Sequence, residues 1–182
     1  MQPIEAMVPP AGSLPPCDDR IAGFYRYWQS IRPMPTALPG RQHFAPEAAR
    51  EFLAGTYLLD VHRDPLRFRV RLIGTELVSF MDHDPTGEWL GEKFRPDFYN
   101  EPTYAHYRAS AEQRLVCYHK GLPVAHLAGH FVQAERLLLP MARDGRTVDM
   151  VLGFAVHHSP LACGAEPAAA IGAAPDFRGG SC

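Results

Sequence analysis

The stretch "RFRVRLIGTELV", residues 67–78, alternates arginine with bulky apolar residues and then reaches Gly74. This alternation predicts a β-strand with two different faces, because successive side chains of a strand point to opposite sides. Phe68, Val70 and Leu72 would share one face, and the three arginines the other. A half-buried antiparallel strand produces such a pattern without any ligand. We therefore interpret the arginines as the wet face of a strand, rather than as an anion site or a nucleic-acid stripe.

The composition of the whole chain is that of one globular domain. With 182 residues and 46% hydrophobic content, it can build one sizeable core. A formal charge of −2 argues against nucleic acid as a partner. No uninterrupted apolar segment is long enough to span a bilayer, and no signal peptide is recognisable. The four cysteines lack the spacing of disulfide scaffolds or zinc knuckles, so we expect a cytoplasmic protein without a membrane partner.

The two ends of the chain differ in composition from its middle. Residues 1–17 are rich in proline, and residues 159–182 are rich in Ala, Gly and Pro. Neither segment has enough large apolar side chains to offset the entropy of ordering it. We therefore expect both segments to be disordered and the folded domain to span residues 18–158.

The folded part begins with a predicted amphipathic helix in "DDRIAGFYRYWQSIRP". Asp18 is placed to cap the helix, and Pro33 to end it. Its apolar stripe could cover its own sheet, cover the sheet of a second copy, or pair with its twin helix. The stripe comprises Ile21, Phe24, Tyr25, Trp28 and Ile31.

The remainder of the domain predicts two strands, a helical middle and three further strands. Asp144-Gly145 supplies a hairpin turn before the last strand. This order favours an α+β fold, with one five-stranded antiparallel sheet and helices gathered over one face. The expected strands are 56–62, 66–73, 123–131, 132–142 and 147–158, and the expected helices between them are 75–81 and 100–118.

Several motifs, in this order, resemble the small stand-alone bacterial PAS-domain proteins that have one PAS fold and an N-terminal helical extension. The motifs are "YRYW", "YLLDVHRDPLRFRVRLIGTEL", "DHDPTGEWL" and "RLLLPMARDGRTVDMVLG", and they fall within residues 24–156. The chain departs from the relatives in the central turn, where a Gly-Arg-Asp-Leu-Thr-Gly type sequence is replaced by residues 81–87. The resemblance implies a five-stranded sheet roofed by helices, and a sensory or interaction module that dimerises through elements flanking the core.

A chamber between sheet and helices is expected on this layout, either solidly packed or holding a small ligand. Its expected walls are Phe68, Val70, Leu72, Leu77, Trp89, Tyr104, Leu139, Leu152 and Phe154. The expected contact surface of a homodimer or of an unknown signalling partner is the helix stripe Ile21, Phe24, Tyr25 and Trp28. We expect a non-catalytic sensory or adaptor protein, and no cofactor can be named from the sequence.

An alternative is a small-molecule enzyme, or a haem- or metal-dependent sensor, that uses the same pocket. His106 is the candidate haem ligand, because it lies in the predicted long helix. His126 and His130 are four residues apart, but in a strand they would lie about 13 Å apart, too far to share a metal ion. Enzyme motifs with phosphate-binding glycines or a nucleophile elbow are absent from the sequence. The carboxylates Asp82, Asp84 and Glu88 are explained as turn residues, so no catalytic or metal-binding residue is assigned.

Overall fold

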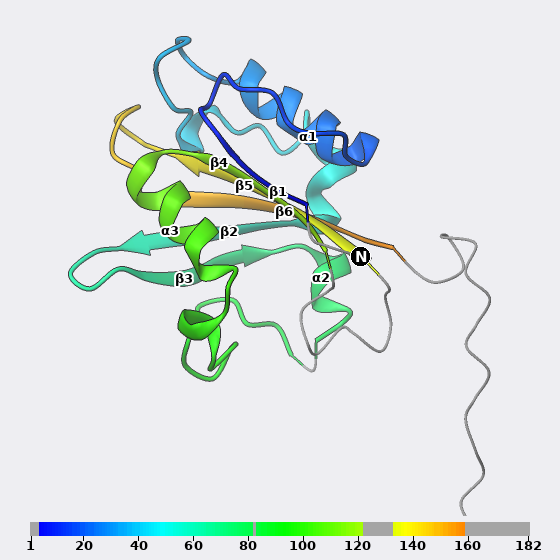
Figure 1. Cartoon of the computed structure of the whole chain (residues 1–182), viewed down its shortest axis with the longest axis vertical. Coiled ribbons are helices and arrows are strands. Elements are labelled where there is room, and N and C mark those ends of the chain that lie inside the picture. Colours follow the sequence, from blue (N-terminus) through cyan, green and yellow to red (C-terminus); the bar gives the residue numbers. More distant parts are fainter. Residues whose placement is uncertain (1–3, 82, 122–132, 159–182) are drawn as a thin grey trace, which may run out of the picture.

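The computed structural model describes residues 4–81, 83–121 and 133–158 of the chain. Its centre is a six-stranded antiparallel sheet with the order β1-β4-β5-β6-β2-β3 (Figure 1). The α+β class is therefore confirmed, with one strand more than expected. The strands are β1 (Ile4–Val8), β2 (Thr56–His62), β3 (Arg67–Ile73), β4 (Val116–Gly121), β5 (Gln133–Met141) and β6 (Met150–His158), and the α-helices are α1 (Asp19–Ser30), α2 (Thr75–Val78) and α3 (Tyr104–Gln113).

Two of these six strands, β1 and β4, were not expected, and β1 lies in the segment expected to be disordered. Residues 4–8 pair antiparallel with β4, and Glu5 lies opposite His119. The expectation for residues 1–17 was wrong at this point because it counted only apolar side chains. A strand at a sheet edge is held largely by backbone hydrogen bonds, which composition does not reveal. The expected tail 159–182 lies outside the described residues.

The helical middle is shorter than its sequence pattern indicated. Helix α3 ends at Gln113, and Arg114 adopts a left-handed conformation with φ 60°, which turns the chain into β4. The expected helix 100–118 therefore contains the start of a strand. The strand expected at 123–131 lies outside the described residues, as do His126 and His130.

The arginines of β3 lie on its outer side, as the alternation predicted. Phe68 and Val70 are buried, whereas Arg69 and Arg71 are exposed. Each arginine has a nearby partner: the Arg67 guanidinium lies 4.2 Å from the centre of the Trp89 ring, Arg69 donates to the Gly87 carbonyl at 2.8 Å, and Arg71 pairs with Asp60 at 3.2 Å. These contacts explain the arginines without an anionic ligand.

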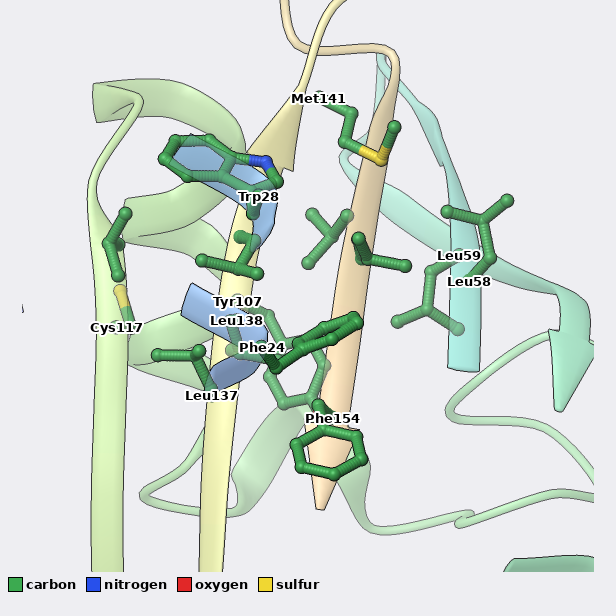
Figure 2. Packing of buried hydrophobic residues seen from close by; sticks show 14 of the residues in the cluster. Phe24, Trp28, Leu58, Leu59, Tyr107, Cys117, Leu137, Leu138, Met141 and Phe154 are labelled. Carbon is green, nitrogen blue, oxygen red and sulfur yellow. The ribbon is translucent and has the colours of Figure 1, made fainter. Parts of the chain in front are cut away.

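Helix α1 covers one face of its own sheet. Asp18 caps it, with its side chain accepting a hydrogen bond from the Arg20 N–H at 2.8 Å. The Phe24 ring lies 4.8 Å from the Phe154 ring and 5.3 Å from the Phe52 ring, measured between ring centres (Figure 2). Of the three arrangements left open for this helix, the structure shows the first, in which the apolar stripe belongs to the core of the same chain.

A buried carboxylate ties the start of α1 to the sheet. Glu135 on β5 is only 1% exposed. It accepts hydrogen bonds from the Asp18 N–H at 2.9 Å and the Tyr118 hydroxyl at 2.8 Å, and Lys120 lies 2.8 Å from its other oxygen. Burial by itself would raise the pKa of Glu135, but these hydrogen bonds and the charge of Lys120 hold that pKa below its usual value.

Candidate functional site

The expected pocket residues do not line one space, because the sheet separates them. Phe68 and Val70 lie on the α3 side, where the Phe68 and Tyr107 ring centres are 5.8 Å apart. Phe154 packs instead against Phe24 on the α1 side. Leu139 and Leu152 are paired across β5 and β6, and Leu152 shares the face of Phe154 by alternation. The assignment of the last strand to the expected chamber was therefore wrong.

The cause of this error is that the sheet is buried on both faces. In β6, residues 151–154 are buried without interruption, and in β5 residues 137–141 are also buried. The alternation of such strands separates two sets of side chains but does not say which set meets which helix. Leu138 and Val151 lie on the α3 side, whereas Leu58, paired with Leu152, lies on the α1 side.

Two further expected wall residues lie outside the core. Leu72 is 47% exposed. The register shift between Leu58 and Leu59 places it on the opposite face of the sheet from Val70. The Trp89 ring packs against the guanidinium of Arg67, on the outer side of β3. The buried residue of this segment is the next one, Leu90. Leu77 on α2 is buried, and the ring of Tyr104 lies 5.5 Å from that of Phe98.

The four expected interface residues are not on the surface. Ile21, Phe24 and Trp28 are fully buried, and Tyr25 is 5% exposed. The Tyr25 hydroxyl donates to the carbonyl oxygen of Gly12 at 2.8 Å. A second copy of the chain cannot reach these side chains without displacing α1. The expectation that this stripe is a contact surface was therefore wrong.

The space between the sheet and α3 is filled by aromatic side chains. Phe98 lies 5.0 Å from Tyr107 and 5.9 Å from Phe68, measured between ring centres. The Tyr57 hydroxyl lies 3.1 Å from that of Tyr107, and the Tyr57 ring covers Gly153 so closely that a Cβ there would come within 2.1 Å of it. Aromatic side chains therefore occupy the part of this layer that these contacts describe.

Two arginines surround this tyrosine pair. Arg95 forms an ion pair with Glu101 and is 11% exposed at its side chain, and the Arg136 guanidinium lies 5.5 Å from the centre of the Tyr107 ring. Burial by itself would raise the pKa of Tyr107, but the positive charges of Arg136 and Arg95 hold it below its usual value. Burial raises the pKa of Tyr57. The layer is thus a packed but polar core.

A cluster of three metal-binding residue types lies at the β1 edge of the sheet. Glu5 comes from β1, His106 from α3 and His119 from β4, and one donor atom of each lies within 4.8 Å of the other two. Glu5 lies 3.1 Å from His119 Nδ1 and 3.5 Å from His106 Nε2. His106 is 3% exposed at its side chain, His119 15% and Glu5 48%. The cluster therefore opens to solvent on the side of Glu5.

Both imidazoles of this cluster favour the neutral form. Burial lowers the pKa of His106, and the charge of Arg136 adds to this effect while Glu5 opposes it. The same causes lower the pKa of His119. Neutral imidazole is the form that donates a nitrogen lone pair to a metal ion.

Of these three residues, the sequence pattern singled out only His106. His106 was considered as a haem ligand, and its Nε2 faces the carboxylate of Glu5 rather than an apolar slot. Glu5 is 114 residues from His119 and lies in a segment expected to be disordered. No local spacing motif joins residues that meet only through the pairing of β1 with β4.

The turn carboxylates behave as turn residues. The Asp84 side chain is exposed and accepts hydrogen bonds from the N–H and the hydroxyl of Thr86, at 2.9 and 2.7 Å. Glu88 lies 3.2 Å from His83, and Asp82 lies outside the described residues. Within the described ranges, no helix has the length and apolar character needed to cross a membrane.

A comparison of the sequence with known protein families agrees with this fold. The family described as the PAS domain matches residues 19–156, which is most of the chain. This chain belongs to the PAS domain family, and the family indicates a role in sensing or signalling. No curated protein and no solved structure matches the chain. The matched range begins at α1, so β1 and Glu5 lie outside it.

Proposed function

We propose that this chain is a non-catalytic sensory or adaptor protein that signals by pairing with a second copy of itself along the edge of β1. Membership of the PAS domain family supports the signalling part. The observation that supports the mode of contact is the difference between the two edges of the sheet.

One edge of the sheet is covered, and the other has no neighbouring strand in the part of the chain that the structure describes. Beside β3, the Gly87 N–H donates to the Val70 carbonyl at 2.7 Å, and the Leu90 N–H to the Phe68 carbonyl at 3.0 Å. Beside β1, no further strand pairs with its outer edge among the described residues. An open strand edge is a template for pairing with another chain.

The side chains of β1 suit such a contact. Ile4 is 47% exposed and Met7 44%, although both are large and apolar. The strand "IEAMV" has neither a lysine nor a proline, which proteins commonly use to block pairing at an edge. Two copies related by a twofold axis would join their β1 strands antiparallel and continue the sheet.

The proposal needs no small ligand beneath α3. The rings of Tyr57, Phe68, Phe98 and Tyr107 occupy that layer. Signalling then depends on which partner β1 binds, and a kinase or another output domain would be reached through that contact.

The test is the mass of the protein in solution with a charge placed on the edge. We expect light scattering to give a dimer for the unmodified chain and a monomer for Met7→Lys. Met34→Lys is the matched control, because Met34 is 60% exposed but lies outside the strands. A monomeric unmodified chain, or a Met7→Lys variant that remains dimeric, would exclude pairing along β1.

A further inference from the structure

The three residues Glu5, His106 and His119 hold their donor atoms close to the geometry of a small metal site. Around a tetrahedral zinc ion with bonds of about 2.0–2.1 Å, ligand atoms lie about 3.4 Å apart. Here Glu5 Oε1 lies 3.1 Å from His119 Nδ1, and Glu5 Oε2 lies 3.5 Å from His106 Nε2. With one donor atom taken from each residue, the three atoms lie within 4.8 Å of one another. The imidazole ring centres are 5.8 Å apart. The donor atoms are thus close enough for one ion to draw them together.

His106 is poorly explained as an ordinary core residue. Its side chain is 3% exposed, its Nδ1 has no hydrogen-bond partner among the described residues, and its other nitrogen has only the contact of 3.5 Å with Glu5. A buried polar group with so little compensation reduces stability, and such groups are rare unless they have another role. An ion bound at Nε2 would replace the long contact with Glu5 by a coordination bond, while Nδ1 would still have no partner among the described residues.

We propose that Glu5, His106 and His119 bind one divalent transition-metal ion of the zinc class. Two imidazoles and one carboxylate leave a fourth coordination position, on the exposed side of Glu5, for water or for a group from outside. The two histidines disfavour calcium and magnesium, which prefer oxygen ligands. The positive charge of Arg136 opposes the ion, so the affinity is expected to be lower than that of a closed structural zinc site.

Metal binding at this position would fasten β1 to the rest of the domain. The three ligands come from β1, α3 and β4, and only β4 pairs with β1 in the described structure. Of the β1 side chains, Ile4, Glu5 and Met7 are exposed, so apolar burial holds the strand weakly. The idea that the ion controls whether the β1 edge can pair with a second copy rests on the proposed function above. The metal site itself does not depend on that function.

The first test measures zinc binding to the full chain after treatment with a chelator. We expect calorimetry with Zn²⁺ to show one ion per chain, and Co²⁺ to give the visible absorption of a tetrahedral site. Glu5→Gln and His119→Gln each remove one ligand and should weaken Zn²⁺ binding roughly tenfold or more. His62→Asn is the control, because His62 is an exposed histidine on the same sheet and should bind Zn²⁺ as the unmodified chain does.

Glu5→Gln is the decisive variant, because the residue is exposed on an edge strand and its replacement should leave the fold intact. Circular dichroism checks that the fold is retained. The proposal is overturned if the unmodified chain does not bind Zn²⁺. It is also overturned if Glu5→Gln and His119→Gln both bind Zn²⁺ as tightly as the unmodified chain does.

The second test asks whether the ion holds β1 in place. We expect Zn²⁺ to slow hydrogen exchange at the amides of residues 4–8 in the unmodified chain and to leave their exchange unchanged in Glu5→Gln. Equal exchange with and without Zn²⁺ in the unmodified chain would refute the fastening of β1. This measurement and the zinc titration are separate from the mass measurement, so a monomeric protein that binds zinc would refute only pairing along β1.

Discussion

The two faces of the sheet are both buried, but they are built from different chemistry. On the α1 side, Phe24, Phe52 and Phe154 pack together with ring centres 4.8–5.7 Å apart. On the α3 side, the aromatic rings pack together with polar groups. These are the paired hydroxyls of Tyr57 and Tyr107 and the guanidinium groups of Arg95 and Arg136. An apolar layer is sufficient to hold a domain together, whereas buried polar groups must be satisfied individually and reduce stability when they are not.

This difference indicates where function is to be sought. On the α1 side, the buried carboxylate Glu135 has several partners, whereas the indole N–H of Trp28 is buried without a partner among the described residues. The α3 side contains His106, whose Nδ1 has no partner among the described residues, and it reaches the solvent-exposed carboxylate of Glu5. The α3 side is the better candidate for binding because its buried histidine lies beside two further residues of metal-binding type.

The largest effect is expected on the apolar side. Phe24→Ala should lower the free energy of unfolding by about 3–5 kcal/mol, because it leaves a cavity between Phe52 and Phe154. Urea unfolding measures the loss. Arg26→Ala, on the exposed side of the same helix, should change stability by no more than about 0.5 kcal/mol. If Phe24→Ala cost as little as Arg26→Ala, α1 would not be part of this core.

An intermediate effect is expected at Glu135. Glu135→Gln should cost about 2 kcal/mol or more near neutrality, because Lys120 loses its charged partner and the hydrogen bonds from the Asp18 N–H and Tyr118 weaken. Glu47→Gln, at an exposed carboxylate, is the matched control and should be close to neutral.

The effect of Glu135 should depend on pH with a defined sign. Its pKa is lowered in the folded protein from the ordinary value of 4.5, so the unfolded chain binds the proton more readily. The stabilisation is therefore complete above pH 4.5 and is lost as the pH falls through the lower, folded value. The free energies of unfolding of the unmodified chain and of Glu135→Gln should therefore become equal in acid. A difference that stayed constant with pH would mean that the charge of Glu135 is not the cause.

The smallest effect is expected within the polar layer. Tyr57→Phe removes the hydroxyl that lies 3.1 Å from that of Tyr107 and should cost about 1 kcal/mol. Tyr99→Phe is the control, because the Tyr99 hydroxyl is buried without a partner among the described residues, so its removal should be neutral or slightly stabilising. Equal losses in thermal or urea unfolding would mean that the Tyr57–Tyr107 contact contributes nothing and that the two faces are energetically alike.

Much of the fold could be predicted from local patterns. The period of two in β3 and the helical spacing in α1 both depend on neighbouring residues, and Gly145 occupies the expected hairpin turn with φ 76°. The end of α3 was missed because a left-handed Arg114 is unusual for a residue other than glycine. Leu72 was misplaced because a bulge depends on the partner strand rather than on the strand's own sequence.

The sequence by itself determined the class of fold, the period of each predicted strand and the amphipathic nature of α1, because these depend on side chains close together in the chain. Only the tertiary structure decided which face of β6 meets which helix. In a sheet that is buried on both faces, the alternation of side chains does not show which face packs against which helix. It also decided that β1 docks on β4, through backbone groups that every residue shares. The cluster of Glu5, His106 and His119 follows from that docking, which brings together residues about a hundred positions apart.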